Sequence, residues 1–261
     1  MIQTNFLNDC NVRKVVEKKG CFSIVEFERD ISVEPSQAIS AYFAAKMNIK
    51  KRQLVAELNN NGLVVQAGAM QMMVGNINVT TNIKGAGDFF KKAVGSKLTG
   101  ETAVKPHYHG SGQLILEPTY KHLLLVDLAN WNGEMVIEDG LFFACEDTVD
   151  MKIVSRNNLS SAALGGQGLF NNSLTGHGVV VLESPVPKEE LIVIDLKDDV
   201  LKVDGNMAIA WSNSLKFTVE KTTANLVGSV ASGEGLVNVF RGTGRVLVAP
   251  VQGNITTTSL V

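Results

Sequence analysis

The chain has 261 residues and a net charge of −2; 45% of its residues are apolar and 19% are charged. This composition supports one or two domains with a sizeable core. The near-neutral charge provides no global field that favours nucleic acid or an anionic membrane. We find no run of 18 apolar residues, so no transmembrane segment is expected.

The N-terminus and the cysteines indicate a cytoplasmic protein. Met1 to Val15 is polar and has no apolar core of the kind found in signal peptides. The three cysteines, Cys10, Cys21 and Cys145, form no C-x-x-C pair. Their odd number and spacing favour reduced thiols over a disulfide framework or a zinc site.

Residues 1–51 are expected to form a strand and helix extension that packs on a β domain at residues 52–261, within one domain overall. A helix is predicted after Pro35, which suits a first helical position. Its apolar stripe should pack on the barrel, and a surface for a partner or a second subunit is the alternative: Ile39, Tyr42, Phe43 and Met47. A shorter helix is expected at residues 88–94. The basic clusters 50–52 and 91–92 are expected to be solvated surface.

One pattern occurs three times in the chain. A Gly-x-Gly pair followed by an apolar run begins at Gly110, Gly176 and Gly242, and both spacings are 66 residues. Short runs such as Val179 to Leu182 are apolar on both faces, which is typical of a sheet that is covered on both sides. The repeats predict an all-β protein with three related units and pseudo-threefold symmetry.

Glycines in these repeats are expected to have structural roles in turns or at close approaches of the backbone. A dinucleotide-binding fingerprint would require a third glycine and a following helix, which are absent from the sequence pattern. The structural glycines that we single out are Gly68, Gly110, Gly112, Gly140, Gly176, Gly178, Gly205, Gly242 and Gly244.

Several motifs together resemble the altered inheritance of mitochondria protein 24 family. They are Gly68-Ala69-Met70, Gly100-Glu101-Thr102 (the family usually has Ser at the last position), Gly166-Gln167-Gly168-Leu169-Phe170, Gly233-Glu234-Gly235-Leu236-Val237 and Gly242-Thr243-Gly244-Arg245-Val246. The resemblance covers about residues 52–250. It implies a TRAP-like double-stranded β-helix. The family has no established enzymatic activity, so the resemblance assigns no catalytic residues to this chain. Eukaryotic members are linked to mitochondrial inner-membrane organisation, whereas this N-terminus is not that of a transit peptide.

The sharpest chemical motif is His107-Tyr108-His109. Histidines at i and i+2 of a strand project from one face, and in cupins such a pair binds a transition metal together with a Glu and a later His. Here Gln113 occupies the position of the Glu, and only His122 and His177 are candidates for the last ligand. A metal site at His107 and His109 is therefore the alternative, and ordinary surface or turn histidines are the favoured interpretation.

We predict a non-enzymatic structural or interaction protein that works as a homo-oligomer, with no catalytic residues and no cofactor. The alternatives are a cupin-like metal-dependent enzyme that uses the two histidines, and a small-molecule or RNA-binding module. Aromatic residues are 6% of the chain and do not alternate with basic ones, so a stacking platform for nucleic acid is not expected. The internal repeat suggests a trimer, with an unknown protein as a further partner.

Overall fold

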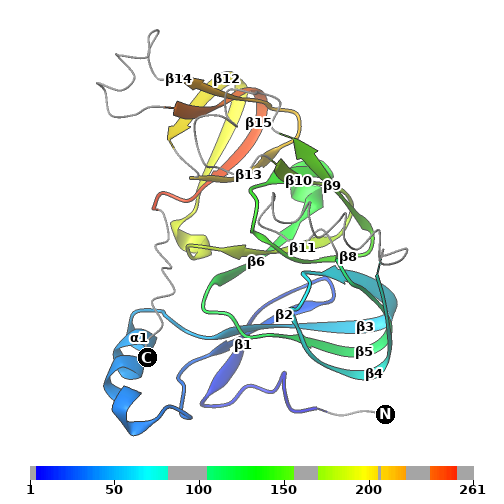
Figure 1. The fold of residues 1–261 in the computed structure, drawn as a ribbon, viewed down its shortest axis with the longest axis vertical. Coiled ribbons are helices and arrows are strands. Elements are labelled where there is room, and N and C mark those ends of the chain that lie inside the picture. The colour runs from blue at the N-terminus through cyan, green and yellow to red at the C-terminus, as the bar shows by residue number, and fades with distance from the viewer. Residues whose placement is uncertain (1–3, 82–104, 156–169, 205–206, 222–235, 252–261) are drawn as a thin grey trace, which may run out of the picture.

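The computed structural model describes residues 4–81, 105–155, 170–204, 207–221 and 236–251. These residues are mostly β-strand and form an eight-stranded and a seven-stranded sheet, which lie one above the other in Figure 1. The first sheet contains β1 (Arg13–Lys19), β2 (Phe22–Phe27), β3 (Arg52–Val65), β4 (Met70–Thr80), β5 (His107–Leu116), β6 (His122–Asp127), β8 (Phe142–Glu146) and β11 (Val179–Ser184). The second contains β7 (Glu134–Ile137), β9 (Val149–Ser155), β10 (Phe170–Gly176), β12 (Ile192–Asp204), β13 (Ala208–Ser212), β14 (Lys216–Lys221) and β15 (Leu236–Val248).

Helix is scarce in the described chain. The α-helix α1 spans Ala38–Lys46 and continues a 3-10 turn, η1, at Pro35–Gln37, so the helix predicted after Pro35 is confirmed. Two further 3-10 turns are η2 (Leu128–Trp131) and η3 (Lys188–Glu190). None of the described helices has the length and apolar character that crossing a membrane requires. The helix expected at residues 88–94 and the basic pair at 91–92 lie outside the described residues.

The core consists of a layer between the sheets and a layer on the far side of each sheet. Alternate residues of β11 show this arrangement, because Val179 and Val181 pack into the cluster of the first sheet, whereas Val180 and Leu182 pack against β7, β10 and β13 of the second. All four side chains are buried. The prediction that this apolar run is covered on both faces is therefore confirmed.

The three Gly-x-Gly pairs lie opposite residues in a left-handed backbone conformation. Asn60 of β3 interrupts the register opposite Ser111 and Gly110 of β5, and Asp198 of β12 does so opposite Gly244 and Gly242 of β15. Asn132 occupies the corresponding place between η2 and β7, where the amide of Gly176 donates to the carbonyl of Gly133. Bulges of the kind found in β3 and β12 increase the local twist and bend the bulged strand.

The N-terminal strands extend the first sheet, because β1 pairs with β2 and β2 pairs with β3. The helix that follows differs from expectation. No residue of α1 is buried, so the prediction that its apolar stripe packs on the barrel is wrong. The physical reason is position: α1 lies at one corner of the molecule, beyond the end of the sheet (Figure 1), where its stripe is not covered by the clusters of the two sheets.

Candidate functional site

The predicted histidine pair lies on β5. Tyr108 between them is buried in the core, so His107 and His109 project to the outer face, and their ring centroids are 6.4 Å apart. The Nε2 atom of His107 lies 3.6 Å from a carboxylate oxygen of Asp147. Gln113, in the position of the cupin Glu, instead accepts a hydrogen bond from the Thr4 hydroxyl at 2.6 Å.

No third ligand joins this pair in the described part of the chain. Among those residues there is no group of three or more His, Cys, Asp or Glu side chains placed to hold a metal ion. His122 lies half-buried on β6, where burial and the nearby Arg52 lower its pKa. His177 is exposed in the turn between β10 and β11. The metal site remains a prediction that rests on two imidazoles.

The predicted structural glycines occupy two kinds of position. Turns contain Gly68, Gly140 and Gly178, and Gly176 is the last residue of β10. The remaining described ones lie inside strands, in β5 and β15: Gly110, Gly112, Gly242 and Gly244. Such positions suit glycine where a neighbouring strand approaches closely. Gly205 lies outside the described residues.

One carboxylate holds the glycine turn of the second repeat in place. Glu146, at the end of β8, accepts hydrogen bonds from the backbone amides of Cys21 at 3.1 Å and Val179 at 2.9 Å. Gly178 has φ +127°, and a Cβ there would lie 2.7 Å from Glu146 Oε2. Glu146 thus connects the β1–β2 turn and the β10–β11 turn to β8. A side chain at position 178 would occupy the space of the Glu146 carboxylate, so this arrangement requires glycine there.

The three cysteines are free and differ in their environment. Burial raises the pKa of Cys145 to about 12, and burial with the neighbouring Glu146 raises that of Cys21 to about 12. Cys10 is exposed, and a hydrogen bond from the Val12 backbone lowers its pKa.

We expect Cys10 to react first with a maleimide at pH 7.5, because the thiolate is the nucleophile and only this thiol combines exposure with a lowered pKa. Mass spectrometry after short labelling should find one adduct, on Cys10. Labelling in denaturant is the control and should reach all three thiols. Equal labelling of Cys145 in the folded protein would contradict the buried position of β8.

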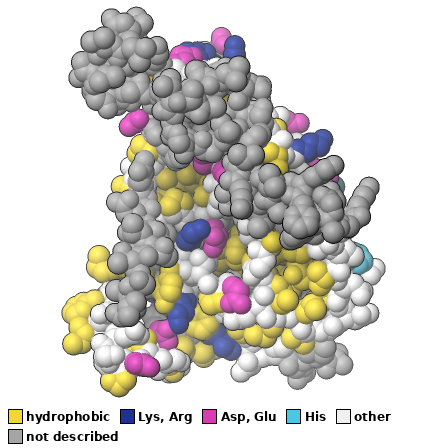
Figure 2. All heavy atoms as spheres, viewed as in Figure 1, with side chains coloured by type: hydrophobic (Ala, Val, Ile, Leu, Met, Phe, Trp, Pro, Cys, Tyr) yellow, Lys and Arg dark blue, Asp and Glu magenta, His cyan; other side chains and the backbone are white. Residues whose placement is uncertain are grey.

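The face of α1 is an unusual surface among the described residues. Every residue of the helix except Ser40 and Lys46 is apolar, yet Ile39 is 75% exposed and Phe43 is 61% exposed. Figure 2 shows hydrophobic side chains gathered at the corner where α1 lies. We call this surface the α1 face and define it by its large exposed apolar residues: Ile31, Ile39, Tyr42, Phe43, Met47 and Ile49.

A network of ion pairs anchors the base of α1 to the first sheet. Glu26 of β2 accepts hydrogen bonds from Lys50 Nζ at 2.8 Å and from Arg52 Nε at 3.0 Å. The Arg52 guanidinium also donates to the side chain and the carbonyl of Asn48, just after the helix. Arg52 is only 5% exposed, so the expectation that this basic cluster is solvated surface is wrong. The clustering of charge could not reveal this, because Glu26, the carboxylate that Lys50 and Arg52 share, lies 24 and 26 residues away from them on β2.

We expect Arg52→Met to lower the free energy of unfolding by about 2 kcal/mol. Removing one partner of a buried ion pair leaves the other charge buried without a partner, which is destabilising. Glu26 would still pair with Lys50, so the loss of stability should be smaller than for an isolated pair. Urea denaturation measures the change. Lys14→Met is the control, since Lys14 is exposed and lies 3.8 Å from Glu28, and it should be nearly neutral. Equal effects of the two substitutions would contradict the anchoring role.

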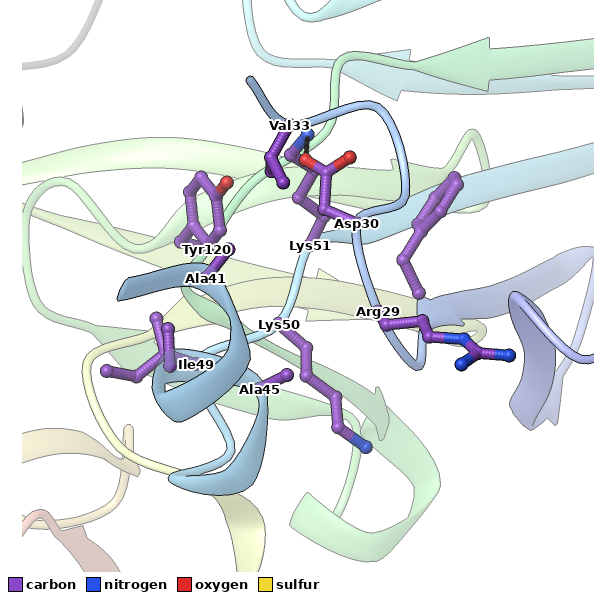
Figure 3. Close-up of a pocket in the computed structure, with 11 residues that line it drawn as sticks. Arg29, Asp30, Val33, Ala41, Ala45, Ile49, Lys50, Lys51 and Tyr120 are labelled. Carbon is purple, nitrogen blue, oxygen red and sulfur yellow. Dashed lines mark hydrogen bonds and ion pairs between the residues drawn. The ribbon is translucent and has the colours of Figure 1, made fainter. Parts of the chain in front are cut away.

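A small cavity lies between α1 and the start of β3. Its volume is about 60 Å³, and Figure 3 shows Ala41, Ala45 and Ile49 on the helix side with Tyr120 and Lys51 nearby. Lys51 is paired with Asp30 across the cavity wall. Pockets for small organic ligands are typically about 300–1,000 Å³, so this space suits a few water molecules and does not indicate a substrate.

Comparison with known proteins places the chain in a family. The sequence profile of the mitochondrial biogenesis AIM24 family matches residues 46–251. The chain belongs to this family. An uncharacterised protein of Streptococcus pyogenes serotype M6 is 28% identical over 201 residues, which are 74% of this chain and 78% of that protein.

A crystal structure of a Streptococcus pyogenes protein is similar in fold. Its TM-score is 0.58 at 23% identity, and the match covers 79% of this chain and 90% of that chain. The AIM24 match agrees with the resemblance found in the glycine motifs and includes all the strands from β3 to β15. It begins at Lys46, so most of α1 lies N-terminal to the part of the chain that the profile covers.

Proposed function

We propose that this AIM24 family member is a non-enzymatic interaction protein that works as a homo-oligomeric scaffold. The observation that carries the proposal is the α1 face, an apolar helix with no buried residue on an otherwise well-packed protein. A helix that is apolar on all sides is normally covered. Contiguous exposed apolar patches mark interaction sites on folded proteins.

Burial of this face supplies a driving force for association. Removing apolar surface from water contributes about 25 cal/mol per Å², and the side chains of Ile39, Tyr42 and Phe43 are all more than half exposed. The C-terminal end of α1, the helix that carries these side chains, is anchored by the network of Glu26, Lys50 and Arg52. A preorganised apolar surface loses little conformational entropy when a partner covers it.

Sedimentation velocity from about 1 to 100 µM tests this proposal. We expect the wild type to associate and Phe43→Ser to weaken association by at least about tenfold, because a large aromatic anchor is lost. Val200→Ser is a matched control, since Val200 is an exposed apolar residue on β12, far from α1 in the chain. A monomeric wild type over the whole range would refute the scaffold function.

We also propose that the two sheets are three copies of one unit in a TRAP-like double-stranded β-helix, with residues 1–51 as an extension. The support is that Asn60, Asn132 and Asp198 are left-handed residues in equivalent places beside the three glycine pairs. The free thiols suit a reducing compartment, and we therefore propose a cytoplasmic location.

A further inference from the structure

We infer that the α1 face is covered by the α1 face of a second copy of this chain, in an antiparallel contact around a two-fold axis. This inference rests on the proposed self-association and specifies its geometry. It follows from the order of side chains along the helix and from the charges at its two ends.

The apolar side chains of α1 form a seam with a self-complementary order. Ile39, Tyr42 and Phe43 follow each other at helical spacing, and Lys46 continues the same stripe one turn later. In an antiparallel pair centred near residue 41, Ile39 faces Phe43 of the partner subunit, and Tyr42 lies near the axis. A two-fold contact requires that each residue and its counterpart exchange places in this way.

The charges at the two ends lie within two residues of the same register. Glu34 precedes the helical segment and Lys46 ends it; both are exposed, and α1 itself carries no acidic residue. Within one copy these two residues are about 20 Å apart, at about 1.5 Å per residue of α-helix and about 2 Å per residue of the 3-10 turn that precedes it, too far to pair. With Ile39 opposite Phe43 of the partner subunit, residue 46 lies opposite residue 36, so Glu34 is displaced by only two residues, about 3 Å, from Lys46 of the partner subunit. The two long side chains can cover this distance, and the pair forms twice, once on each side of the axis. A parallel arrangement would place like charges together.

The charge pattern favours a second copy over a lipid surface. An interfacial membrane helix usually carries several cations along its polar face, whereas α1 contains only Lys46, whose Nζ lies 5.5 Å from the centroid of the Tyr42 ring. The neighbouring Lys50 and Lys51 are engaged with Glu26 and Asp30. The contact gives a dimer, in place of the trimer suggested by the sequence repeat.

A nine-residue helix is about 14 Å long, which is less than a standard interface requires, since such interfaces bury about 800 Å² per partner. The contact should therefore be weak and depend on concentration. Its charged rim should make it weaker at high salt.

Charge reversal tests the geometry. We expect Glu34→Lys and Lys46→Glu each to weaken dimerisation by about tenfold at 50 mM salt, because each change replaces two attractive pairs by two repulsive ones. The double variant E34K/K46E should restore the wild-type dissociation constant to within about threefold, since the pairs form again with exchanged partners. Circular dichroism checks that all variants fold.

Three outcomes would overturn the inference. If the wild type associates and the single reversals leave its dissociation constant unchanged, the contact lies elsewhere, although the proposed function stands. If both singles weaken association and the double variant does not recover, the helices are not antiparallel. If the protein stays monomeric and instead co-sediments with phosphatidylglycerol vesicles, a lipid surface covers α1, and the proposed self-association fails with the inference.

Discussion

Gly110→Val should lower the free energy of unfolding by about 3–5 kcal/mol, a large part of the roughly 5–15 kcal/mol that stabilises a typical folded protein. Gly110 lies inside β5 with φ +145°, and a Cβ there would lie 2.1 Å from the carbonyl oxygen of Asn76 on β4. The obstruction is backbone of a paired strand, so it cannot be relieved by a side-chain rotation. Denaturation in guanidinium, followed by fluorescence, measures the loss.

Gly68→Ala separates backbone strain from this steric clash. Gly68 has φ +81°, but a Cβ there would meet no atom within 4 Å. The substitution should therefore cost only the strain of a left-handed residue, about 1 kcal/mol. If Gly68→Ala and Gly110→Ala destabilise equally, close approach of β4 to β5 is not the reason for the glycine.

Phe240→Ala should also destabilise by about 3–5 kcal/mol, because it opens a cavity in the core of the second sheet. Phe240 is fully buried, and its ring centroid lies 5.2 Å from those of Trp211 and Phe217. Phe43→Ala is the matched control, since the same atoms are removed from an exposed helix position and the monomer should change by less than about 0.5 kcal/mol. A neutral Phe240→Ala would mean that the three rings are not a packed cluster.

The sequence predicts the strands better than the surface. Apolar runs such as Val179 to Leu182 indicate burial on both faces, because neither face of the strand carries a polar residue there. In the structure all four of these side chains are buried. The helix after Pro35 is also found, because its start signal is local. An apolar stripe, however, looks the same in a sequence whether it is packed or exposed, and so the position of α1 could not be predicted.

The charge network under α1 could not be predicted for a related reason. Lys50 and Arg52 reach Glu26 across paired strands, and such pairing depends on register, which a basic cluster does not encode. Glu146 is another such case, since its two donors come from turns 125 and 33 residues away. The histidine pair was visible as a motif, and its geometry on one face of β5 follows from strand periodicity alone.

Concentration-dependent hydrogen exchange tests the central claim most directly. Amide exchange in residues 38–47 should be slower at 100 µM than at 1 µM, because a second copy then stabilises α1, whereas β12 should exchange equally at both concentrations. Protection that follows the fraction of dimer would establish the α1 face as the contact. If the protein assembles while exchange in residues 38–47 stays the same at both concentrations, the account is contradicted.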